Sequence, residues 1–176
     1  TGVDPDRVGK EPKDPDGPHR WTSLGSSEVH AFLAPGRVLG GTAWTFANAA
    51  AQPVDLLVVD EAGQLSLAHL LGASALAETV LLLGDPQQLP QVSRGEHPQP
   101  IGDAALTWIA EGAPVLRPDR GFFLDTSWRM HSALTRAVSE LSYAGRLGAR
   151  EEVTDARRLD GVEPGLHPWP VSHTGN

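Results

Sequence analysis

Two short apolar runs constrain the fold of this chain more than any other feature. Residues 54–59 and 79–83 are rich in Val and Leu and do not alternate with polar residues. Such runs are typical of strands that are covered on both faces of a parallel sheet. Between them, Ser66 is a suitable helix N-cap, and one stripe at helical spacing holds Leu67, Leu70, Leu71, Ser74 and Ala75. The pattern predicts a strand, helix, strand crossover with parallel strands.

Acidic, amide and glycine residues directly follow each run. They are Asp60, Glu61, Gln64, Gly84, Asp85 and Gln88. Because the carboxyl ends of parallel strands meet at the edge where open α/β sheets bind ligands, we expect these residues to lie close together. An Asp–Glu pair at that edge suits a magnesium-dependent nucleoside triphosphatase, in which Asp60 holds the metal through water and Glu61 polarises the attacking water. An ordinary acidic turn is the plainer alternative for the pair taken alone.

The second loop, residues 84–90, is the more specific signature. An amide both donates and accepts hydrogen bonds, so Gln88 at the mouth of a strand can register whether a γ-phosphate is present. A proline-bounded loop with surface glutamines is the alternative. A second signature only one crossover from the first favours the phosphate interpretation.

Composition narrows the class of protein. The net charge of −8 argues against a generally basic nucleic-acid-binding surface but leaves room for a local arginine-lined groove. The absence of cysteine excludes disulfides and thiolate metal sites, and the histidines show no metal-ligand spacing. No apolar run approaches the ~20 residues of a membrane span, and the polar start lacks a signal-peptide pattern. A cytoplasmic protein is therefore expected.

The flanking segments are less regular. Residues 1–28 combine prolines with charged residues and are expected to form a flexible linker or loop. A short helix is expected to end at Leu33, and a short strand over residues 37–42 leads to Thr42 and Trp44. A further helix is expected from Asp103 through Glu111.

A second body is expected after a linker at 113–121. Residues 122–126 predict a strand, and Trp128 and Arg129 follow it. An amphipathic helix comes next, with an apolar stripe of Leu134, Ala137, Val138 and Leu141. The Arg129 guanidinium could reach a phosphate held by the first body, although a surface arginine is the alternative. Trp128 could stack on a base or sugar, and Thr42 and Trp44 could contact nucleic acid, with simple packing as the alternative for each.

Together these residues resemble a superfamily 1 helicase of the 5′-to-3′ branch, which includes the nonsense-mediated-decay RNA helicase. They also resemble bacterial proteins that join a RecB-like nuclease to such a motor. Residues 60–64 match the Walker B motif, 84–90 the motif that couples phosphate to nucleic acid, and 128–131 the first motif of the second RecA-like domain. Thr42, after two glycines, stands where the family has a nucleic-acid-contacting motif.

The resemblance implies an α/β fold: an incomplete parallel-sheet RecA-like P-loop NTPase domain at 29–112 and the beginning of a second RecA-like domain at 122–176. It implies ATP and Mg²⁺ as cofactors, and single-stranded DNA or RNA and the rest of the parent polypeptide as partners. The implied roles are Asp60 for Mg²⁺, Glu61 for the attacking water, Gln88 for the γ-phosphate and Arg129 as the arginine finger. The other nucleotide-contacting residues would be Gln64, Gly84, Asp85 and Trp128.

One expected motif has no counterpart. A Walker A loop needs G-x-x-x-x-G-K-[ST], and the only Gly-Lys pair, at Gly9, is followed by Glu11. The chain therefore looks like a middle fragment of a longer motor and should be inactive in isolation. Two alternatives stay open: a truncated, non-catalytic nucleotide- or nucleic-acid-binding module, and a magnesium-dependent nuclease using Asp60, Glu61 and Asp85. The nuclease is less favoured because nucleases fused to such motors also use a lysine, and neither Lys10 nor Lys13 is expected to lie in a suitable strand.

Overall fold

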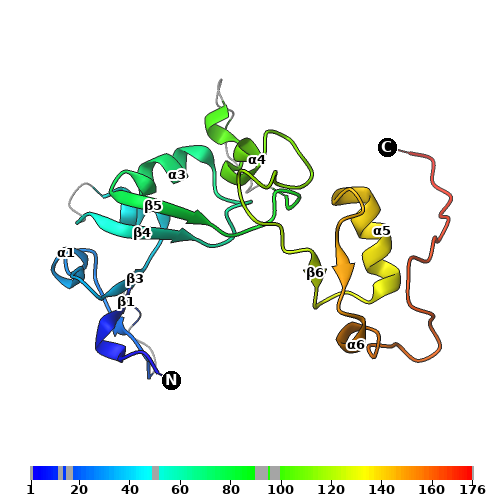
Figure 1. The fold of residues 1–176 in the computed structure, drawn as a ribbon, viewed down its shortest axis with the longest axis horizontal. Helices are drawn as coiled ribbons and strands as arrows, with labels where there is room; N and C mark the ends of the chain where they lie inside the picture. The colour runs from blue at the N-terminus through cyan, green and yellow to red at the C-terminus, as the bar shows by residue number, and fades with distance from the viewer. Residues whose placement is uncertain are drawn as a thin grey trace. The chain divides into compact units, whose positions relative to one another are not determined.

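The computed structural model describes residues 2–11, 14, 18–48, 52–89, 95 and 100–175. The chain forms two compact units, unit 1 (Thr1–Ile109) and unit 2 (Ala110–Asn176) (Figure 1). In the part of the chain that the structure describes, the strands of each sheet pair in parallel, with only two isolated antiparallel bridges outside them, so the predicted α/β class with parallel sheets is confirmed. Among the described residues, no helix has the length and apolar character that a membrane crossing requires.

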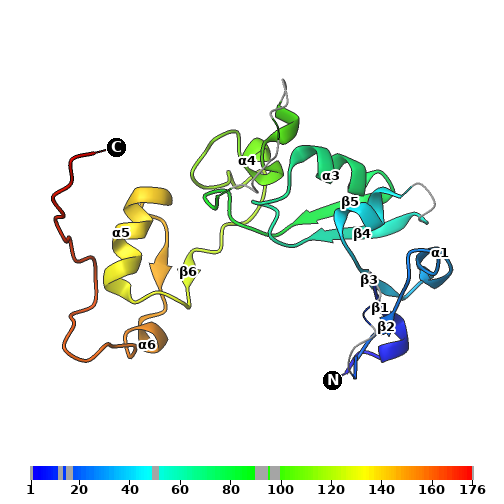
Figure 2. The ribbon, with the colours of Figure 1, turned by 180° about the vertical axis from the view of Figure 1, so that it is seen from behind.

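The predicted crossover is present in unit 1. Strand β4 (Val54–Val59) pairs in parallel with β5 (Ala77–Leu82), and α3 (Leu67–Ser74) connects them and runs beside them (Figures 1 and 2). Ser66 caps α3 by accepting a hydrogen bond from the backbone N–H of His69. The predicted stripe is partly wrong, because α3 buries Ala73 with Leu67 and Leu70, while Leu71 is 55% exposed.

One face of the β4–β5 pair is uncovered by the described chain. Leu57 is buried, but the residues of the opposite face are between 44% and 51% exposed: Leu56, Val58, Leu81 and Leu83. The expectation of strands covered on both faces is therefore wrong for this chain. The two strands nonetheless have the continuous apolar sequence of buried parallel strands.

Unit 1 also contains a three-stranded parallel sheet in the order β2-β1-β3. A short 3₁₀ helix, η1 (Pro5–Arg7), leads into β1 (Val8–Lys10), which lies between β2 (Thr22–Ser23) and β3 (Val38–Gly40). Residues 1–28, which were expected to form a flexible linker or loop, thus contain a short 3₁₀ helix and two short strands. Gly9 sits in the centre of β1, and a Cβ there would lie 2.6 Å from the Leu24 and Phe32 side chains. The only Gly-Lys pair is therefore part of a strand, not a phosphate loop.

Short helices complete unit 1. Helix α1 (Val29–Phe32) buries Val29 and Phe32, with the Phe32 ring beside Gly9 of β1, and α2 (Ala43–Ala47) packs against α3. After η2 (Pro100–Gly102), helix α4 (Ala105–Ile109) is shorter than the predicted span from Asp103 through Glu111. It ends early because Glu111 and Gly112 both take positive φ values, 54° and 73°.

Unit 2 is smaller. It contains β6 (Thr126–Ser127), α5 (Ser132–Ser142), β7 (Gly148–Ala149) and α6 (Glu151–Thr154), with β6 and β7 parallel. The strand expected over 122–126 is wrong, because β6 begins at Thr126 and the Phe122 side chain is 96% exposed. The helix itself is confirmed. Its buried residues, however, are Thr135 and Ser139, whereas Leu141 of the apolar stripe is 82% exposed.

Candidate active site

The turn after β4 positions the two carboxylates. The backbone N–H of Glu61 donates to Asp60 Oδ1 at 3.0 Å, and the N–H of Gln64 donates to the Glu61 carbonyl at 2.9 Å. Glu61 has a φ of 53°, in the left-handed region that residues other than glycine rarely adopt. Both carboxylates are exposed at the carboxyl end of the strand. The turn therefore fixes their backbone positions and leaves their side chains accessible to a ligand.

The loop after β5 packs directly against this turn through backbone atoms. The N–H of Ala62 donates to the Leu83 carbonyl at 2.8 Å. A Cβ on Gly63 would lie 2.1 Å from the Asp85 carbonyl oxygen, and one on Gly84 would lie 2.8 Å from the Ala62 nitrogen. Only glycine fits at either position. The loops that carry the two predicted signatures can therefore approach this closely only because neither glycine has a side chain.

A side-chain hydrogen bond joins the same two loops. Gln64 Nε2 donates to Gln88 Oε1 at 3.1 Å, although the two residues lie 24 positions apart. Asp85 shapes its own loop by accepting the backbone N–H of Gln87 at its Oδ1, at 2.9 Å. The structure therefore brings together all six residues that were predicted at this edge of the sheet.

The donor set at this edge fits a magnesium ion of the kind that nucleotides bring. Asp60 Oδ1 is used by the turn, and Oδ2 is left to act as a ligand, directly or through water. Mg²⁺ in such sites uses one or two carboxylates and takes its other ligands from water and phosphate. No group of three His, Asp or Glu residues that could cage a metal occurs in the described ranges. Asp60, Glu61 and Asp85 therefore do not form a nuclease-type carboxylate cluster there.

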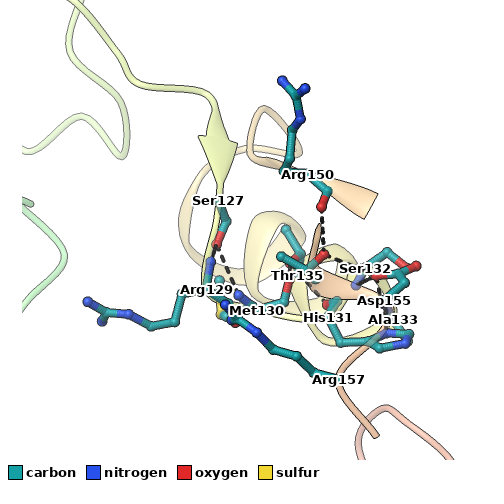
Figure 3. A network of polar contacts seen from close by, with 11 residues as sticks. Ser127, Arg129, Met130, His131, Ser132, Ala133, Thr135, Arg150, Asp155 and Arg157 are labelled. Carbon is teal, nitrogen blue, oxygen red and sulfur yellow. Dashed lines mark hydrogen bonds and ion pairs between the residues drawn. The ribbon is translucent and has the colours of Figure 1, made fainter. Parts of the chain in front are cut away.

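Residues 128–131 of unit 2, the finger segment, carry the predicted arginine finger and are fixed by hydrogen bonds to their backbone. Ser127 Oγ accepts the N–H groups of Arg129 and Met130, both at 3.3 Å, and the Arg157 guanidinium donates to the Arg129 carbonyl. Figure 3 shows the Arg129 side chain extending away from these contacts. Trp128 is 58% exposed, with the Arg150 guanidinium 5.0 Å from its ring centroid. The backbone is fixed while the Arg129 guanidinium projects outward.

Asp155 fastens the start of α5 behind that segment. Its two carboxylate oxygens accept the Ser132 N–H at 2.9 Å and the Ser132 hydroxyl at 2.6 Å, and Thr154 donates a third hydrogen bond (Figure 3). These bonds from Ser132 favour the ionised carboxylate and lower the pKa of Asp155 below its ordinary value. Thr135, which is nearly fully buried, donates to the Met130 and His131 carbonyls.

The predicted nucleic-acid residues lie at the beginning of α2. Thr42 is its N-cap, and its hydroxyl accepts the backbone N–H of Thr45. Trp44 is 73% exposed and touches the His69 ring edge-on, with centroids 5.4 Å apart. Simple core packing, the plainer alternative for Trp44, therefore does not describe it.

Sequence reasoning missed Glu11, Asp155 and Arg157. Asp155 binds Ser132, 23 residues before it, and Arg157 binds the Arg129 carbonyl, 28 residues before it. Glu11 accepts hydrogen bonds from the Ser26 and Thr45 hydroxyls, 15 and 34 residues away. Contacts at such separations have no local pattern, so no sequence signal could have identified them.

Comparison with known proteins places the chain in a family. Residues 20–163 match the model of the AAA domain. The chain belongs to the AAA domain family. This family accounts for the parallel α/β architecture, and it implies the use of a nucleotide together with Mg²⁺, for which the edge of the β4–β5 pair supplies suitable groups.

A curated relative resembles part of the chain. It is the DNA replication ATP-dependent helicase/nuclease JHS1 of Arabidopsis thaliana, 27% identical over 118 residues. The aligned region is 65% of this chain and 9% of the relative. The chain thus spans less than a tenth of the relative's length.

Proposed function

We propose that this chain is the part of an ATP-dependent superfamily 1 helicase or translocase that carries its hydrolytic and coupling loops. The supporting observation is the junction of the two loops, where Gly63 abuts the Asp85 backbone and Gln64 donates to Gln88. The junction brings the Asp60–Glu61 carboxylate pair and the Gln88 amide to one sheet edge, the edge at which open α/β sheets bind ligands. The AAA domain match and the likeness to a helicase/nuclease support the broader class of nucleic-acid-related ATPases, to which such a motor belongs.

The proposed roles follow from the chemistry of the exposed groups. Asp60 holds the Mg²⁺ that accompanies ATP, and the metal supplies charge neutralisation for the transferring phosphoryl group. The Glu61 carboxylate accepts a proton from the attacking water and so orients it for in-line attack. Arg129, on the separate unit 2, supplies a permanently charged guanidinium for the charge that develops on the γ-phosphate.

Gln88 is the proposed sensor. Because its Oε1 accepts from Gln64, its own Nε2 group is turned outward as a donor. A donor held in this orientation can bind a γ-phosphate oxygen and lose that bond after hydrolysis. The Gln64–Gln88 bond would thereby transmit the state of the nucleotide to the β4 turn. Movement along single-stranded DNA or RNA, with 5′-to-3′ polarity, would be the output.

The test is Glu61→Gln in the complete protein, with steady-state ATP hydrolysis and equilibrium nucleotide binding both measured. Glutamine keeps the size of the side chain but is a poor base, so hydrolysis should fall by about 10²- to 10⁴-fold while binding is retained. The matched control is Glu78→Gln on β5, which is exposed near the opposite end of the same strand pair. It should leave both quantities unchanged.

An equal loss of binding and hydrolysis in Glu61→Gln would assign Glu61 a structural or metal-binding role. Unchanged hydrolysis would contradict the proposal and favour the non-catalytic binding module.

A further inference from the structure

A cavity of about 150 Å³ opens in unit 1, away from the β4 and β5 loops. Val29 and His30 of α1 form one wall, and Trp44 and Asn48 form another. Glu11, the residue after β1, contributes its carboxylate. Thr42 and Trp44, the two residues predicted to contact nucleic acid, also line this cavity, which combines one large aromatic surface with one fixed acidic group.

The carboxylate of Glu11 is held by hydroxyl groups. Ser26 Oγ donates to its Oε1 at 2.8 Å, and Thr45 Oγ1 donates to its Oε2. A carboxylate has about four acceptor positions, so each oxygen can accept one further hydrogen bond. No lysine or arginine in the described ranges forms an ion pair with Glu11. Glu11 is therefore oriented and still able to bind a donor.

The charge of the cavity selects against phosphate. Neither lysine nor arginine contributes to its described walls, and Glu11 would repel an anion. A ligand must therefore present hydrogen-bond donors to Glu11 and keep any phosphate outside. Amino groups on a planar ring meet this requirement.

Trp44 favours a flat ligand. Its 73% exposed indole is the largest accessible ring at the cavity, and His69 touches it only edge-on. Indole faces stack on nucleobases, and this stacking is worth about 1–3 kcal/mol per base. Ammonium ligands are instead usually enclosed by several aromatic rings, which this cavity lacks.

We propose that the cavity accepts one base of a single-stranded nucleic acid, stacked on Trp44 with its amino group donating to Glu11. This inference rests on the proposed function, because it assumes that a nucleic-acid strand is the substrate. It adds a preference: bases with an exocyclic amino group, such as cytosine, should bind better than thymine or uracil, since a carboxylate accepts from the cytosine N4 amino group.

The position of the cavity suits a strand site in such a motor. Trp44 contacts His69, and His69 Nδ1 lies 3.0 Å from the Ser66 hydroxyl, two residues after Gln64. A base on Trp44 is therefore connected by direct contacts to the turn that carries the proposed water-polarising carboxylate. The contacts show a physical connection that could carry coupling between strand and nucleotide.

The experiment measures binding of the complete protein, without nucleotide, to fluorescent (dC)₁₂ and (dT)₁₂ by anisotropy at pH 8, where cytosine is neutral. We expect (dC)₁₂ to bind roughly tenfold more tightly than (dT)₁₂. In Glu11→Gln this preference should disappear or reverse, because the glutamine amide can donate to the thymine O4. A purely structural role of Glu11 would weaken both oligonucleotides equally, and that outcome would overturn the proposal.

The stacking surface is tested by Trp44→Ala, which should weaken both oligonucleotides by about 5- to 100-fold. Trp44→Phe should retain most of the affinity, which separates loss of stacking from misfolding. The control is Trp108→Ala on α4, which is 52% exposed in the same unit and should change neither affinity. Unchanged affinity in Trp44→Ala would overturn the proposal.

Two competitions identify the source of the base. Unlabelled (dC)₁₂ should displace the probe at far lower concentration than cytidine monophosphate or a lysine-rich peptide. Equal competition by the mononucleotide, or displacement by the peptide, would overturn the assignment to a strand. Failure of these tests leaves the Glu61→Gln result unaffected, so the cavity and the proposed hydrolytic function fail separately.

Discussion

The two motif-bearing regions are held in place by opposite means. The loops after β4 and β5 meet backbone to backbone, through Gly63 and Gly84, where a Cβ would lie within 3 Å of neighbouring main-chain atoms. The segment before α5 is held by polar side chains, with Ser127, Asp155 and Arg157 bonded to its backbone or to the start of the helix (Figure 3). In both regions the residues proposed to meet the nucleotide project outward.

This difference determines which kind of change would disrupt each region. A backbone contact depends on the absence of side chains, so it tolerates changes of pH and salt but not an added methyl group. The polar side chains of Ser127, Ser132, Asp155 and Arg157 form the clamp of unit 2. Part of this clamp depends on the ionised carboxylate of Asp155, so it weakens in acid.

The largest effect is expected for Arg129→Ala in the complete protein. If the clamp exists to present this guanidinium, nucleic-acid-stimulated kcat should fall by roughly 10³- to 10⁵-fold, the range of arginine fingers. The melting temperature should hardly change, because no hydrogen bond of the Arg129 side chain occurs among the described contacts. Steady-state kinetics and thermal melting measure the two quantities.

Arg136→Ala is the matched control, since Arg136 is also exposed in unit 2, on α5. It should retain parental turnover. Arg129→Ala kinetics within a fewfold of the parent would show that Arg129 is not the finger, and the clamp would then have a structural purpose only.

Gly63→Ala should be the most destabilising single methyl addition in unit 1. Its Cβ would lie 2.1 Å from the Asp85 carbonyl oxygen, so one loop must move, at a cost of about 3 kcal/mol in the free energy of unfolding. Gly72→Ala, within α3, meets only the Ala47 Cβ at 3.4 Å and should stabilise by up to about 1 kcal/mol. Urea unfolding of the purified chain measures both. If Gly63→Ala and Gly72→Ala were equally stable, the close backbone contact between the two loops would not contribute to the stability of unit 1.

Asp155→Asn probes the clamp of unit 2 through pH. Because the pKa of Asp155 is lowered in the folded state, its stabilisation is complete above the ordinary carboxyl pKa of about 4 and is lost as the pH falls through the lower, folded value. The parent should therefore lose more melting temperature between pH 6 and pH 3 than Asp155→Asn, which should already be less stable at pH 6.

Hydrogen exchange of the α5 amides locates that effect. Exchange at the start of α5 should be faster in Asp155→Asn than in the parent at pH 6. Asp160→Asn, at an exposed acidic position of unit 2, should resemble the parent. Parallel pH profiles of the parent and Asp155→Asn would contradict the clamp.

The regions that could be predicted from the sequence are those in which a local pattern of apolar residues determines the secondary structure. The β4–α3–β5 crossover follows from composition and helical spacing, and the meeting of its two loops follows from parallel pairing. Helix α5 was predicted by its period. Its buried face was not, because the buried residues Thr135 and Ser139 are polar and find hydrogen-bond partners just outside the helix, at the Met130 carbonyl and the Leu147 N–H.

The short strands β1 and β2 could not be predicted, whereas β3 lies within the strand expected over 37–42. Strands β1 and β2 contain three and two residues, too few for a period, and they form only because β3 and the Leu24 and Phe32 side chains complete their surroundings. Conversely, residues 122–125 have a strand-like sequence but form no strand, because the register with β7 covers only Thr126 and Ser127, and Asp125 contributes just its carbonyl, which accepts the Gly148 N–H. The cavity at Glu11 likewise depends on residues far apart in the chain.

The left-handed backbone at Glu61 has a consequence for protein engineering. A glutamate at a φ of 53° is strained by about 1–2 kcal/mol relative to an ordinary conformation, and glycine would remove that strain. A redesign that selects only for thermal tolerance would therefore tend to replace Glu61 with glycine. Such a variant would melt later and lack the carboxylate proposed for hydrolysis, so screens on this scaffold need turnover as a second criterion.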